Sequence, residues 1–553
     1  MKRRTLLKSL AGAIPAMSLS KILMAENLFD QSKAGEIMTT GSFEPTWDSL
    51  KKYQVPDWFR NAKFGIWAHW GPQCQPEHGD WYARSLYMEG SDDYKFHLKK
   101  YGHPSKFGFK DVIHEWKAEK WDPEQLVSLY KLAGAKYFVA LANHHDNFDN
   151  YDSSYQSWNS TKLGPEKDLI AGWADAAKKN GLRFGVSVHA SHAWMFYEKA
   201  QKADAAGSFA GIPYDGNIKK ESGKNTWWDG LDPQELYAQN HPLSINADVD
   251  EVFYKQWDWS HGANVPDKRY CDKFFNRTIE LINKYDPDLV YFDDTILPLY
   301  PISDAGLRIA AHLYNKSIKK NNGRLEAVIN GKILGEMQRK CMVWDIERGQ
   351  SNGIEPLPWQ TDTCIGNWHY DRALYDAKGY KSAATLIHSL ADIVSKNGNL
   401  LLSIPVRGDG TIDEQELAIV EEIAAWMQVN GESIFDTRPW KIFGEGPAIA
   451  SAEALTNQGF NEGSGKTFTS QDIRFTSKGD VLYAIVLGEP PSGKVVIKSL
   501  AADSKIYQNK IARISLAGSN EALPIFRNEE GLMASIPEKY PKQFAYVLKI
   551  LSA

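Results

Sequence analysis

The 553-residue chain lacks several features that would assign it to a class at once. It has 64 Lys and Arg against 69 Asp and Glu, a formal net charge of −5 at pH 7. No basic surplus is available to hold a polyanion, so no nucleic-acid partner is expected. The four cysteines form no CxxC pair. Free buried thiols are therefore expected, with neither a zinc knuckle nor a disulfide framework.

Common catalytic and membrane signatures are also missing. There is no GxSxG motif, which argues against a serine hydrolase of that type. No GxGxxG opens a helix, which argues against a dinucleotide site. The longest apolar stretch is shorter than the ~20 residues that a membrane-spanning helix needs. We therefore expect that the mature protein, after the export predicted below, does not insert into a membrane.

The N-terminus has the pattern of an export signal. Arg3 and Arg4 precede a modest apolar stretch, Leu10–Leu23, which a glycine and a proline interrupt. Paired arginines before such a stretch resemble a bacterial twin-arginine signal. We predict that residues 1–25 are an export signal and that the protein is periplasmic or extracellular.

Aromatic residues are abundant, with 19 Trp, 25 Tyr and 23 Phe. Aromatic side chains dominate protein cores, so many of them are expected inside. Some stand beside polar residues in loop-like sequence, as in Trp227-Trp228-Asp229-Gly230. Flat rings beside hydrogen-bonding groups suit the apolar faces and hydroxyl rims of sugars.

The middle of the chain alternates short apolar runs with helical periodicity. The predicted strands are Phe64–His69, Tyr137–Asn143, Leu182–Val188, Leu289–Asp293, Ala327–Asn330, Met342–Glu347 and Leu400–Ile404. The predicted helices are one from Pro123, then Ile170–Lys179, Phe274–Tyr285, Ala305–Lys319 and Ala383–Ser395. Such repetition indicates an α/β fold, a (β/α)₈-type TIM-like barrel. Periodicity alone leaves a doubly wound open sheet as the rival.

Two segments differ from this pattern. The connection 190–267 is too long for an ordinary loop, and its tryptophans predict a functional loop or lid. After the helix Asp413–Gln428 and from about Phe468, short alternating runs and turn residues predict an antiparallel β-sandwich. We therefore expect a catalytic barrel over 40–440 and a C-terminal β-sandwich over 441–553.

Ionisable residues gather at the ends of the predicted strands, the edge where barrel enzymes place their sites. The strand ends carry His69-Trp70, His144-His145-Asp146, His189, Asp293-Asp294 and Asp345-Ile346-Glu347-Arg348. A metal-dependent hydrolase fits poorly, because His69 is not part of a His-x-His motif and adjacent His144 and His145 point to opposite sides of an extended strand. Paired carboxylates remain, and Asp293 with Glu347 fits the needs of glycoside hydrolysis.

The alternative for Asp293 is a structural one. Asp is a preferred N-cap residue, and a helix could begin just after this strand. The residues alone leave the two interpretations open.

An ordered set of motifs resembles the α-L-fucosidases of glycoside hydrolase family 29. The motifs are Phe64-Gly65-Ile66-Trp67-Ala68-His69-Trp70-Gly71, Asn143-His144-His145-Asp146, Trp158-Asn159-Ser160, Asp286 to Asp293, Pro358-Trp359-Gln360-Thr361 and Ser395 to Leu402 with Asp409-Gly410. The resemblance runs from about 58 to 440 and is weaker beyond.

The resemblance implies a retaining exo-hydrolase that releases terminal α-L-fucose from a glycan without metal or cofactor. It implies Asp293 as nucleophile and Glu347 as acid/base, with Glu336 and Glu355 as weaker rivals for the second role. It also implies substrate binding by His69, Asp80, His144, His145, His189, Tyr291 and Lys332.

Departures from the family pattern surround the expected nucleophile. Tyr291 stands where tryptophan is common, Asp294 replaces a glycine, and Lys332 takes a place where some members carry arginine. Because these residues lie near the sugar, an α-L-galactosidase or a dual enzyme is the alternative. A catalytically inactive carbohydrate-binding protein is a further alternative, and the sequence gives no oligomeric state.

Overall fold

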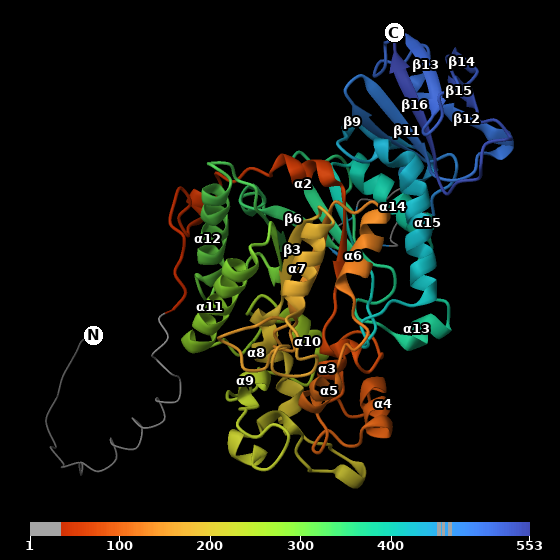
Figure 1. Ribbon diagram of the computed structural model, residues 1–553. Coiled ribbons are helices and arrows are strands. Elements are labelled where there is room, and N and C mark those ends of the chain that lie inside the picture. The colour runs from red at the N-terminus through yellow and green to blue at the C-terminus, as the bar shows by residue number, and fades with distance from the viewer. Residues whose placement is uncertain (1–34, 451–454, 456–458, 463–466) are drawn as a thin grey trace, which may run out of the picture. The chain divides into compact units, whose positions relative to one another are not determined.

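The computed structural model describes residues 35–450, 455, 459–462 and 467–553. The predicted export signal, 1–25, lies outside the described residues. Residues 38–553 form one compact unit, to which everything below refers. Figure 1 shows its helices and strands in chain order.

Eight parallel strands close into a barrel in the order of the sequence. They are β1 (Phe64–Ala68), β2 (Tyr137–Asn143), β3 (Arg183–Val188), β4 (Leu289–Thr295), β5 (Val328–Lys332), β6 (Val343–Glu347), β7 (Trp359–Cys364) and β8 (Gly398–Ser403). β8 pairs with β1, with Phe64 opposite Leu400. The predicted TIM-like barrel is confirmed, and the closure of the sheet excludes the doubly wound rival.

The strand that the sequence did not reveal is β7. All six of its residues are buried, yet Gln360, Thr361, Asp362 and Thr363 are polar. Apolar runs predict buried parallel strands, and β7 lacks one because its polar side chains find partners inside the barrel. Tyr137 Oη, for example, donates to Gln360 Oε1 at 2.8 Å.

The helices cover the barrel unevenly. They are α1 (Trp47–Leu50), α2 (Asp57–Ala62), α3 (Tyr82–Ser85), α4 (Asp92–Lys100), α5 (Phe109–Glu115), α6 (Pro123–Leu132), α7 (Leu169–Lys179), α8 (Ala193–Phe196), α9 (Gln234–Tyr237), α10 (Asp250–Lys255), α11 (Lys268–Tyr285), α12 (Ala305–Lys320), α13 (Arg372–Asp376), α14 (Ala383–Ser395), α15 (Glu414–Asn430) and α16 (Pro447–Ala450). The connections 333–342 and 348–358 contain no α-helix, so β5, β6 and β7 follow one another without the regular βα alternation.

Side-chain caps begin several of the longer helices. Asp168 and Ser382 accept from backbone N–H groups in the first turns of α7 and α14. Asp413 and Glu416 form a capping box at the start of α15. These caps satisfy N–H groups that have no partner within the helix.

The connection 190–267 folds over the C-terminal ends of the strands as short helices and turns. Its tryptophans divide into different roles. Trp228 and Trp259 are buried, Trp194 stacks on His241 at 4.1 Å, and Trp227 stacks on His114 at 4.2 Å. Trp257 lines the cavity described below.

Two antiparallel sheets follow the barrel in the sequence. The first has the order β13-β16-β11-β10-β9 and the second β12-β15-β14. Their strands are β9 (Arg438–Glu445), β10 (Ile473–Lys478), β11 (Val481–Val486), β12 (Lys494–Ile497), β13 (Ile511–Leu516), β14 (Ile525–Asn528), β15 (Gly531–Ser535) and β16 (Tyr546–Ser552). Both sheets contribute to a hydrophobic core of their own. β9 crosses the position, 440/441, at which the sequence places the domain boundary.

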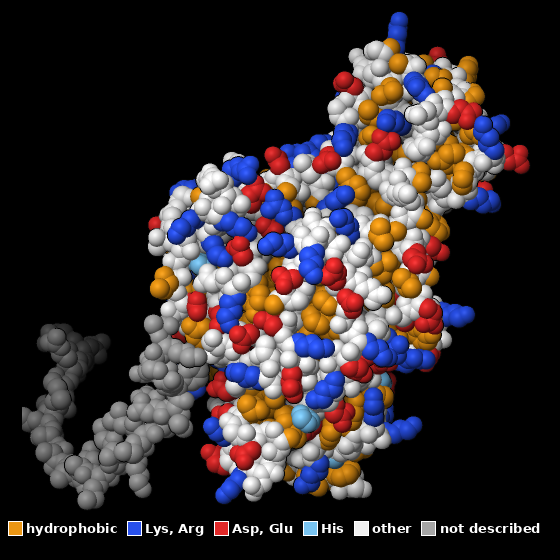
Figure 2. Space-filling model, viewed as in Figure 1, with side chains coloured by type: hydrophobic (Ala, Val, Ile, Leu, Met, Phe, Trp, Pro, Cys, Tyr) orange, Lys and Arg blue, Asp and Glu red, His pale blue; other side chains and the backbone are white. Residues whose placement is uncertain are grey.

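The surface and the thiols agree with the sequence. On the face in Figure 2, basic and acidic side chains are interspersed without a large area of one sign. All four cysteines are free and buried, as predicted. Among the described residues, no helix is long and apolar enough to cross a membrane.

Candidate active site

A cavity of about 650 Å³ opens at the C-terminal ends of the barrel strands. All nine site residues predicted from the sequence line it: His69, Asp80, His144, His145, His189, Tyr291, Asp293, Lys332 and Glu347. Glu336 and Glu355, the weaker candidates for the acid/base, are not among its lining residues. The closed barrel therefore brings the predicted residues together.

Asp293 stands inside β4, and three polar side chains contact its carboxylate. Lys332 Nζ lies 2.5 Å from Asp293 Oδ1, while His145 Nε2 and His189 Nδ1 lie 2.9 and 3.2 Å from Oδ2. Burial by itself would raise the pKa of Asp293, but the Lys332 charge and the two histidine contacts hold it well below its usual value. The strand continues to Thr295 and no helix begins there, so the N-cap interpretation of Asp293 is wrong.

Glu347 ends β6 and has the opposite electrostatic setting. Burial, opposed by the Lys332 charge and reinforced by that of Asp293, raises the pKa of Glu347 to about 7. The side chains of Asp293 and Glu347 are each about a fifth exposed, at 19% and 18%, and both face the cavity. One carboxyl is thus kept ionised and the other is kept protonated up to about neutral pH.

Lys332 connects the two carboxyls. It ends β5, and its ammonium bonds both Asp293 Oδ1 and Glu347 Oε2. Burial would lower the pKa of Lys332, but the surrounding carboxylates hold it well above its usual value. The ammonium is therefore a fixed positive charge between the two acids.

Two further carboxyls lie inside the barrel near Lys332, Asp293 and Glu347. Asp345 and Asp362 are completely buried on β6 and β7. Tyr291 Oη donates to Asp362 at 2.6 Å, and Gln360 Nε2 donates to Asp345 at 2.7 Å. The hydroxyl of Tyr291 is thus occupied within the barrel, and its ring, 5.4 Å from Lys332 Nζ, forms part of the cavity wall.

The adjacent residues His144 and His145 do not point apart as the sequence suggested. The pairing of β2 with β3 is irregular between Leu141 and Asn143, and the chain turns directly after Asn143. Successive side chains point to opposite sides only where the backbone is extended. His144 and His145 lie beyond the strand end, so their rings converge, with centroids 4.4 Å apart.

His145 and His189 contact the carboxylate of Asp293 rather than facing free space. His145 Nδ1 donates to the carbonyl of His189 at 2.8 Å, and its Nε2 faces Asp293. His189 reaches Asp293 through Nδ1, and burial lowers the pKa of His189 to about 4, so the ring is neutral. Both residues orient the carboxylate of Asp293.

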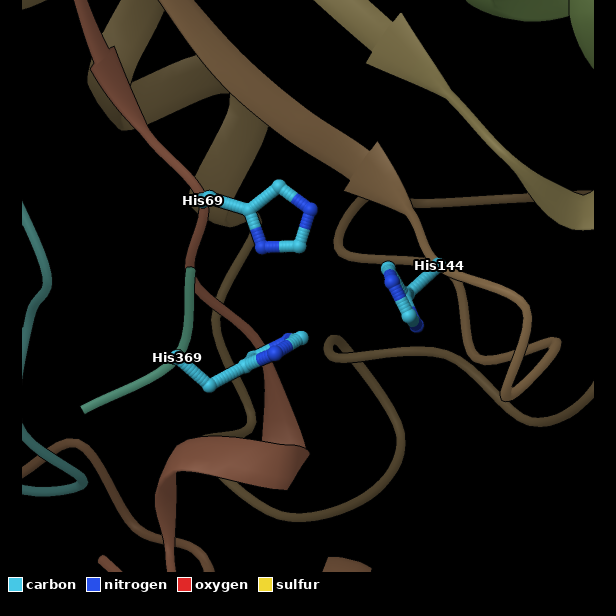
Figure 3. Close-up of side chains that lie close together, drawn as sticks. All are labelled: His69, His144 and His369. Carbon is cyan, nitrogen blue, oxygen red and sulfur yellow. The ribbon is translucent and has the colours of Figure 1, made fainter. Parts of the chain in front are cut away.

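The carboxylate of Asp80 accepts hydrogen bonds from the backbone of a loop. Its Oδ1 and Oδ2 accept the backbone N–H groups of His369 and Trp368 at 2.7 and 3.2 Å. Those two residues lie in the connection between β7 and α13 and line the cavity. His369 meets His69 and His144, which come from the ends of β1 and β2 (Figure 3).

Several cavity residues escaped the sequence analysis. His369 and Trp368 follow the unrecognised strand β7. Tyr254 comes from the long connection, whose Trp257 the sequence had singled out and which also lines the cavity, and Phe460 comes from a segment after the barrel. The backbone N–H of Phe460 donates to the carbonyl of Glu347 at 2.7 Å, a contact that nothing in the local sequence indicates.

Histidines form two groups with the spacing of metal ligands. In each of His69–His144–His369 and His144–His145–His189, one nitrogen per residue lies within 4.8 Å of the others. In the second group, His145 and His189 already contact Asp293. The first is considered in the last section of these Results.

Comparison with known proteins identifies the family. Residues 31–432 match the family model of α-L-fucosidase, and residues 466–551 match that of the α-L-fucosidase C-terminal domain. The chain belongs to the α-L-fucosidase family. It is therefore a glycoside hydrolase by family, and family members act on glycans.

Individual relatives cover nearly all of this fucosidase-family chain. Human tissue α-L-fucosidase is 25% identical over 531 residues, which is 92% of this chain and 91% of the relative. The α-L-fucosidase of Branchiostoma floridae is 27% identical, over 82% and 84% of the two chains.

Solved structures share the fold. The Thermotoga maritima α-fucosidase in complex with fucose has a TM-score of 0.64 at 24% identity, covering 92% of this chain and all of that one. A trapped covalent intermediate of a Bacteroides thetaiotaomicron α-L-fucosidase has a TM-score of 0.57 at 15% identity, covering 93% and 98%.

Proposed function

We propose that this protein is a retaining exo-α-L-fucosidase that releases terminal α-L-fucose from glycans by double displacement. The observation that carries the proposal is the pair Asp293 and Glu347, joined by one ammonium and driven to opposite protonation states. Different environments for two neighbouring carboxyls are the means by which glycosidases separate a nucleophile from an acid.

In the first step, Asp293 attacks the anomeric carbon while Glu347 gives its proton to the leaving glycosidic oxygen. The C–O bond to the aglycone breaks and a fucosyl ester of Asp293 forms. In the second step, Glu347, now ionised, takes a proton from water, and the hydroxide attacks the same carbon. The ester breaks, fucose leaves with its configuration retained, and Glu347 is protonated again.

The distance between the carboxyls supports retention. Because Asp293 Oδ1 and Glu347 Oε2 bond the same nitrogen, these two facing oxygens are at most two short hydrogen bonds apart, about 5 Å. Retaining enzymes hold their carboxyls ~5–5.5 Å apart, whereas inverting enzymes need ~6.5–9.5 Å to admit a water. The covalent intermediate described for the Bacteroides relative is in line with this route.

An apolar corner supports a 6-deoxy sugar. The rings of Trp67 and Trp368 meet at 5.4 Å on the cavity wall, beside the polar histidines. L-Fucose has a methyl group at C5 where L-galactose has a hydroxymethyl group. A methyl group against two indoles gains from burial, whereas a hydroxymethyl group there must give up its water. We therefore favour fucose over L-galactose.

We also propose that the enzyme is periplasmic or extracellular, because its N-terminal sequence resembles an export signal.

The nucleophile is tested first. We expect Asp293→Asn to lower kcat on an aryl α-L-fucoside at least 10³-fold while the thermal transition persists, because the ester cannot form. Azide added to Asp293→Gly should restore turnover and yield the inverted fucosyl azide. The matched control is Asp288→Asn, which should leave kcat unchanged because Asp288 bonds Arg183 at 3.0 Å outside the cavity. Turnover of Asp293→Asn at the wild-type rate would contradict the assignment.

The sugar is tested by a panel of aryl α-L-fucoside, α-L-galactoside and natural fucosylated glycans. We expect kcat/KM for fucoside to exceed that for galactoside by at least tenfold, since one buried unpaired hydroxyl costs this much. Equal or reversed values would replace fucose with L-galactose on the same scaffold. Sugar binding without any hydrolysis would indicate an inactive binding protein.

A further inference from the structure

His369 occupies a central place in the cavity that the mechanism above does not use. It is 1% exposed. Its ring lies 4.6 Å from that of His69 and 4.9 Å from that of His144, nearly perpendicular to both (Figure 3). Three imidazoles from three separate segments thus face one another beside Trp368 on the cavity wall.

Three of their ring nitrogens lack hydrogen-bond partners. Among the described residues, neither ring nitrogen of His369 has a hydrogen bond, and His69 Nδ1 has none either. Buried polar atoms almost always have partners, because desolvation without a replacement bond is costly. A polar ligand that enters this corner would supply the missing bonds.

The state of His144 shows which chemistry the corner presents. Gln73 Oε1 accepts from Ala83 N at 3.3 Å and its Nε2 donates to Asp146 at 3.3 Å, which fixes the orientation of the amide. The same Nε2 lies 2.6 Å from His144 Nδ1. Nδ1 must therefore accept, and the hydrogen of the neutral ring is on Nε2.

This assignment distinguishes a hydroxyl from a metal ion. A metal needs a lone pair from each imidazole, and the lone pair of His144 already faces the Gln73 amide. Burial and the neighbouring imidazoles lower the pKa of both His69 and His144 far below the usual value, so the rings are neutral. A neutral imidazole offers one donor and one acceptor, which matches a hydroxyl group.

Asp80 holds His369 in this position. Its carboxylate accepts the backbone N–H groups of Trp368 and His369, and Oδ1 also lies 3.4 Å from His369 Nδ1. An acidic partner at Nδ1 favours the hydrogen on that nitrogen and leaves Nε2 as an acceptor. Asp80 thus acts on the sugar through the ring that it positions.

We propose that His369 is a substrate-binding residue, positioned by Asp80, that accepts a hydrogen bond from a ring hydroxyl of the terminal sugar. The inference rests on the proposed function, since the ligand is taken to be the sugar that is cleaved. It makes His369 a determinant of which hydroxyl pattern the enzyme accepts.

A cycle of enzyme and substrate deletions tests the contact. Wild type and His369→Phe are assayed with p-nitrophenyl α-L-fucoside and its 2-, 3- and 4-deoxy analogues. Removing a hydroxyl changes the intrinsic reactivity equally for both enzymes, so the ratio of the two effects isolates the contact. For one analogue we expect the loss of kcat/KM to be about tenfold smaller in His369→Phe than in wild type. Equal losses for all three analogues would overturn the proposal.

The control variant is His114→Phe, which replaces a histidine stacked on Trp227 outside the cavity. It should leave all three ratios unchanged. Asp80→Asn keeps one acceptor oxygen for the loop and should raise KM more than it lowers kcat. Combined with His369→Phe, Asp80→Asn should add less than twofold, because it acts through the same ring. Full additivity would overturn the positioning role.

Two binding measurements distinguish a failure of the proposed function from a failure of the His369 contact, and a sugar ligand from a metal ion. If wild type does not hydrolyse the fucoside, the proposed function fails. His369 is then tested by calorimetric titration with L-fucose and L-galactose. Affinity about tenfold weaker in His369→Phe for either sugar supports the contact, and unchanged affinity for both overturns it. Titration with zinc chloride should show no binding that His369→Phe abolishes. One-to-one zinc binding lost in that variant would replace the hydroxyl with a metal site.

Discussion

At the scale of single residues, the proposed mechanism makes the first chemical step depend on the protonation of Glu347. Glu347 must be protonated to act as an acid, and its pKa is raised to about 7, so it is competent below that value and loses its proton as pH rises through it. The pKa of Asp293 is lowered, so the proposed nucleophile stays ionised well into the acid range. We expect kcat/KM to fall on the alkaline side with a midpoint near pH 7.

Glu347→Gln checks this assignment. The alkaline decline should disappear, and the loss of rate should be large for substrates with poor leaving groups and small for 2,4-dinitrophenyl α-L-fucoside, which needs no proton. The matched control is Glu355→Gln, whose carboxyl bonds Ser351 outside the cavity. An unchanged alkaline limb in Glu347→Gln would assign that limb to another group.

Lys332 is expected to determine the pH values at which kcat/KM falls on both the acid and the alkaline side. Its charge lowers the pKa of Asp293 and of Glu347, so Lys332→Met should move both limbs to higher pH and lower kcat at neutral pH. Lys332→Arg preserves the charge and should keep both limbs near their wild-type positions, although its planar fork differs in geometry. A profile of Lys332→Met that matches wild type would contradict this electrostatic role. The measurement is kcat/KM from pH 4 to 9 for the three enzymes.

At the scale of elements, one buried ion pair ties the histidine-bearing loop to a helix. Arg277 of α11 bonds Asp149, 2.6 Å away, in the loop that follows His144 and His145, and both side chains are at most 3% exposed. We expect Arg277→Met to lower the free energy of unfolding by about 3–5 kcal/mol, since it leaves Asp149 buried without its cation. Chemical denaturation measures this change.

Two comparisons sharpen the prediction for Arg277. Arg308→Met on α12, where the partner Asp304 is exposed and 3.9 Å away, should cost less than about 1 kcal/mol. The double variant Arg277→Met/Asp149→Asn should recover part of the loss, because no charge is left buried alone. A loss for Arg277→Met no greater than for Arg308→Met would show that the pair does not anchor the loop.

At the scale of the whole molecule, a buried charge cluster joins the barrel to the C-terminal sheets. Asp392 on α14 bonds Lys396 at 2.7 Å and Arg474 on β10 at 2.5 Å. Burial would raise the pKa of Asp392, but the two cations hold it below its usual value. The cluster therefore stabilises the fold above the unfolded-state pKa of about 3.9 and loses that contribution as pH falls through the folded-state pKa.

Asp392→Ala should destabilise the protein by about 3–5 kcal/mol at pH 7, because it leaves two buried cations unpaired. At pH 3 the difference from wild type should shrink. Asp436→Ala breaks an exposed pair with Lys478 and is the control, expected to lie within about 1 kcal/mol of wild type. Thermal scans at both pH values measure the change, and equal losses for Asp392→Ala and Asp436→Ala would contradict it.

The sequence by itself determined seven of the eight barrel strands and the two candidate catalytic carboxyls. Apolar runs and strand-end acids are local patterns, and the ordered family motifs reinforced them. β7 escaped because its buried residues are polar, and their partners, such as Tyr137 for Gln360, come from distant strands. His369 escaped with it, since this histidine follows an unrecognised strand.

Only the tertiary structure decided what each predicted residue does. Lys332 joins Asp293 to Glu347 because β4, β5 and β6 are neighbours in the barrel. Asp80 meets His369, across 289 residues of sequence, because barrel closure pairs β8 with β1 and β7 pairs with β8. Which polar groups are partnered, and which remain for a sugar, depends on such long-range pairings, because a hydrogen bond requires particular distances in space, which a local pattern does not encode.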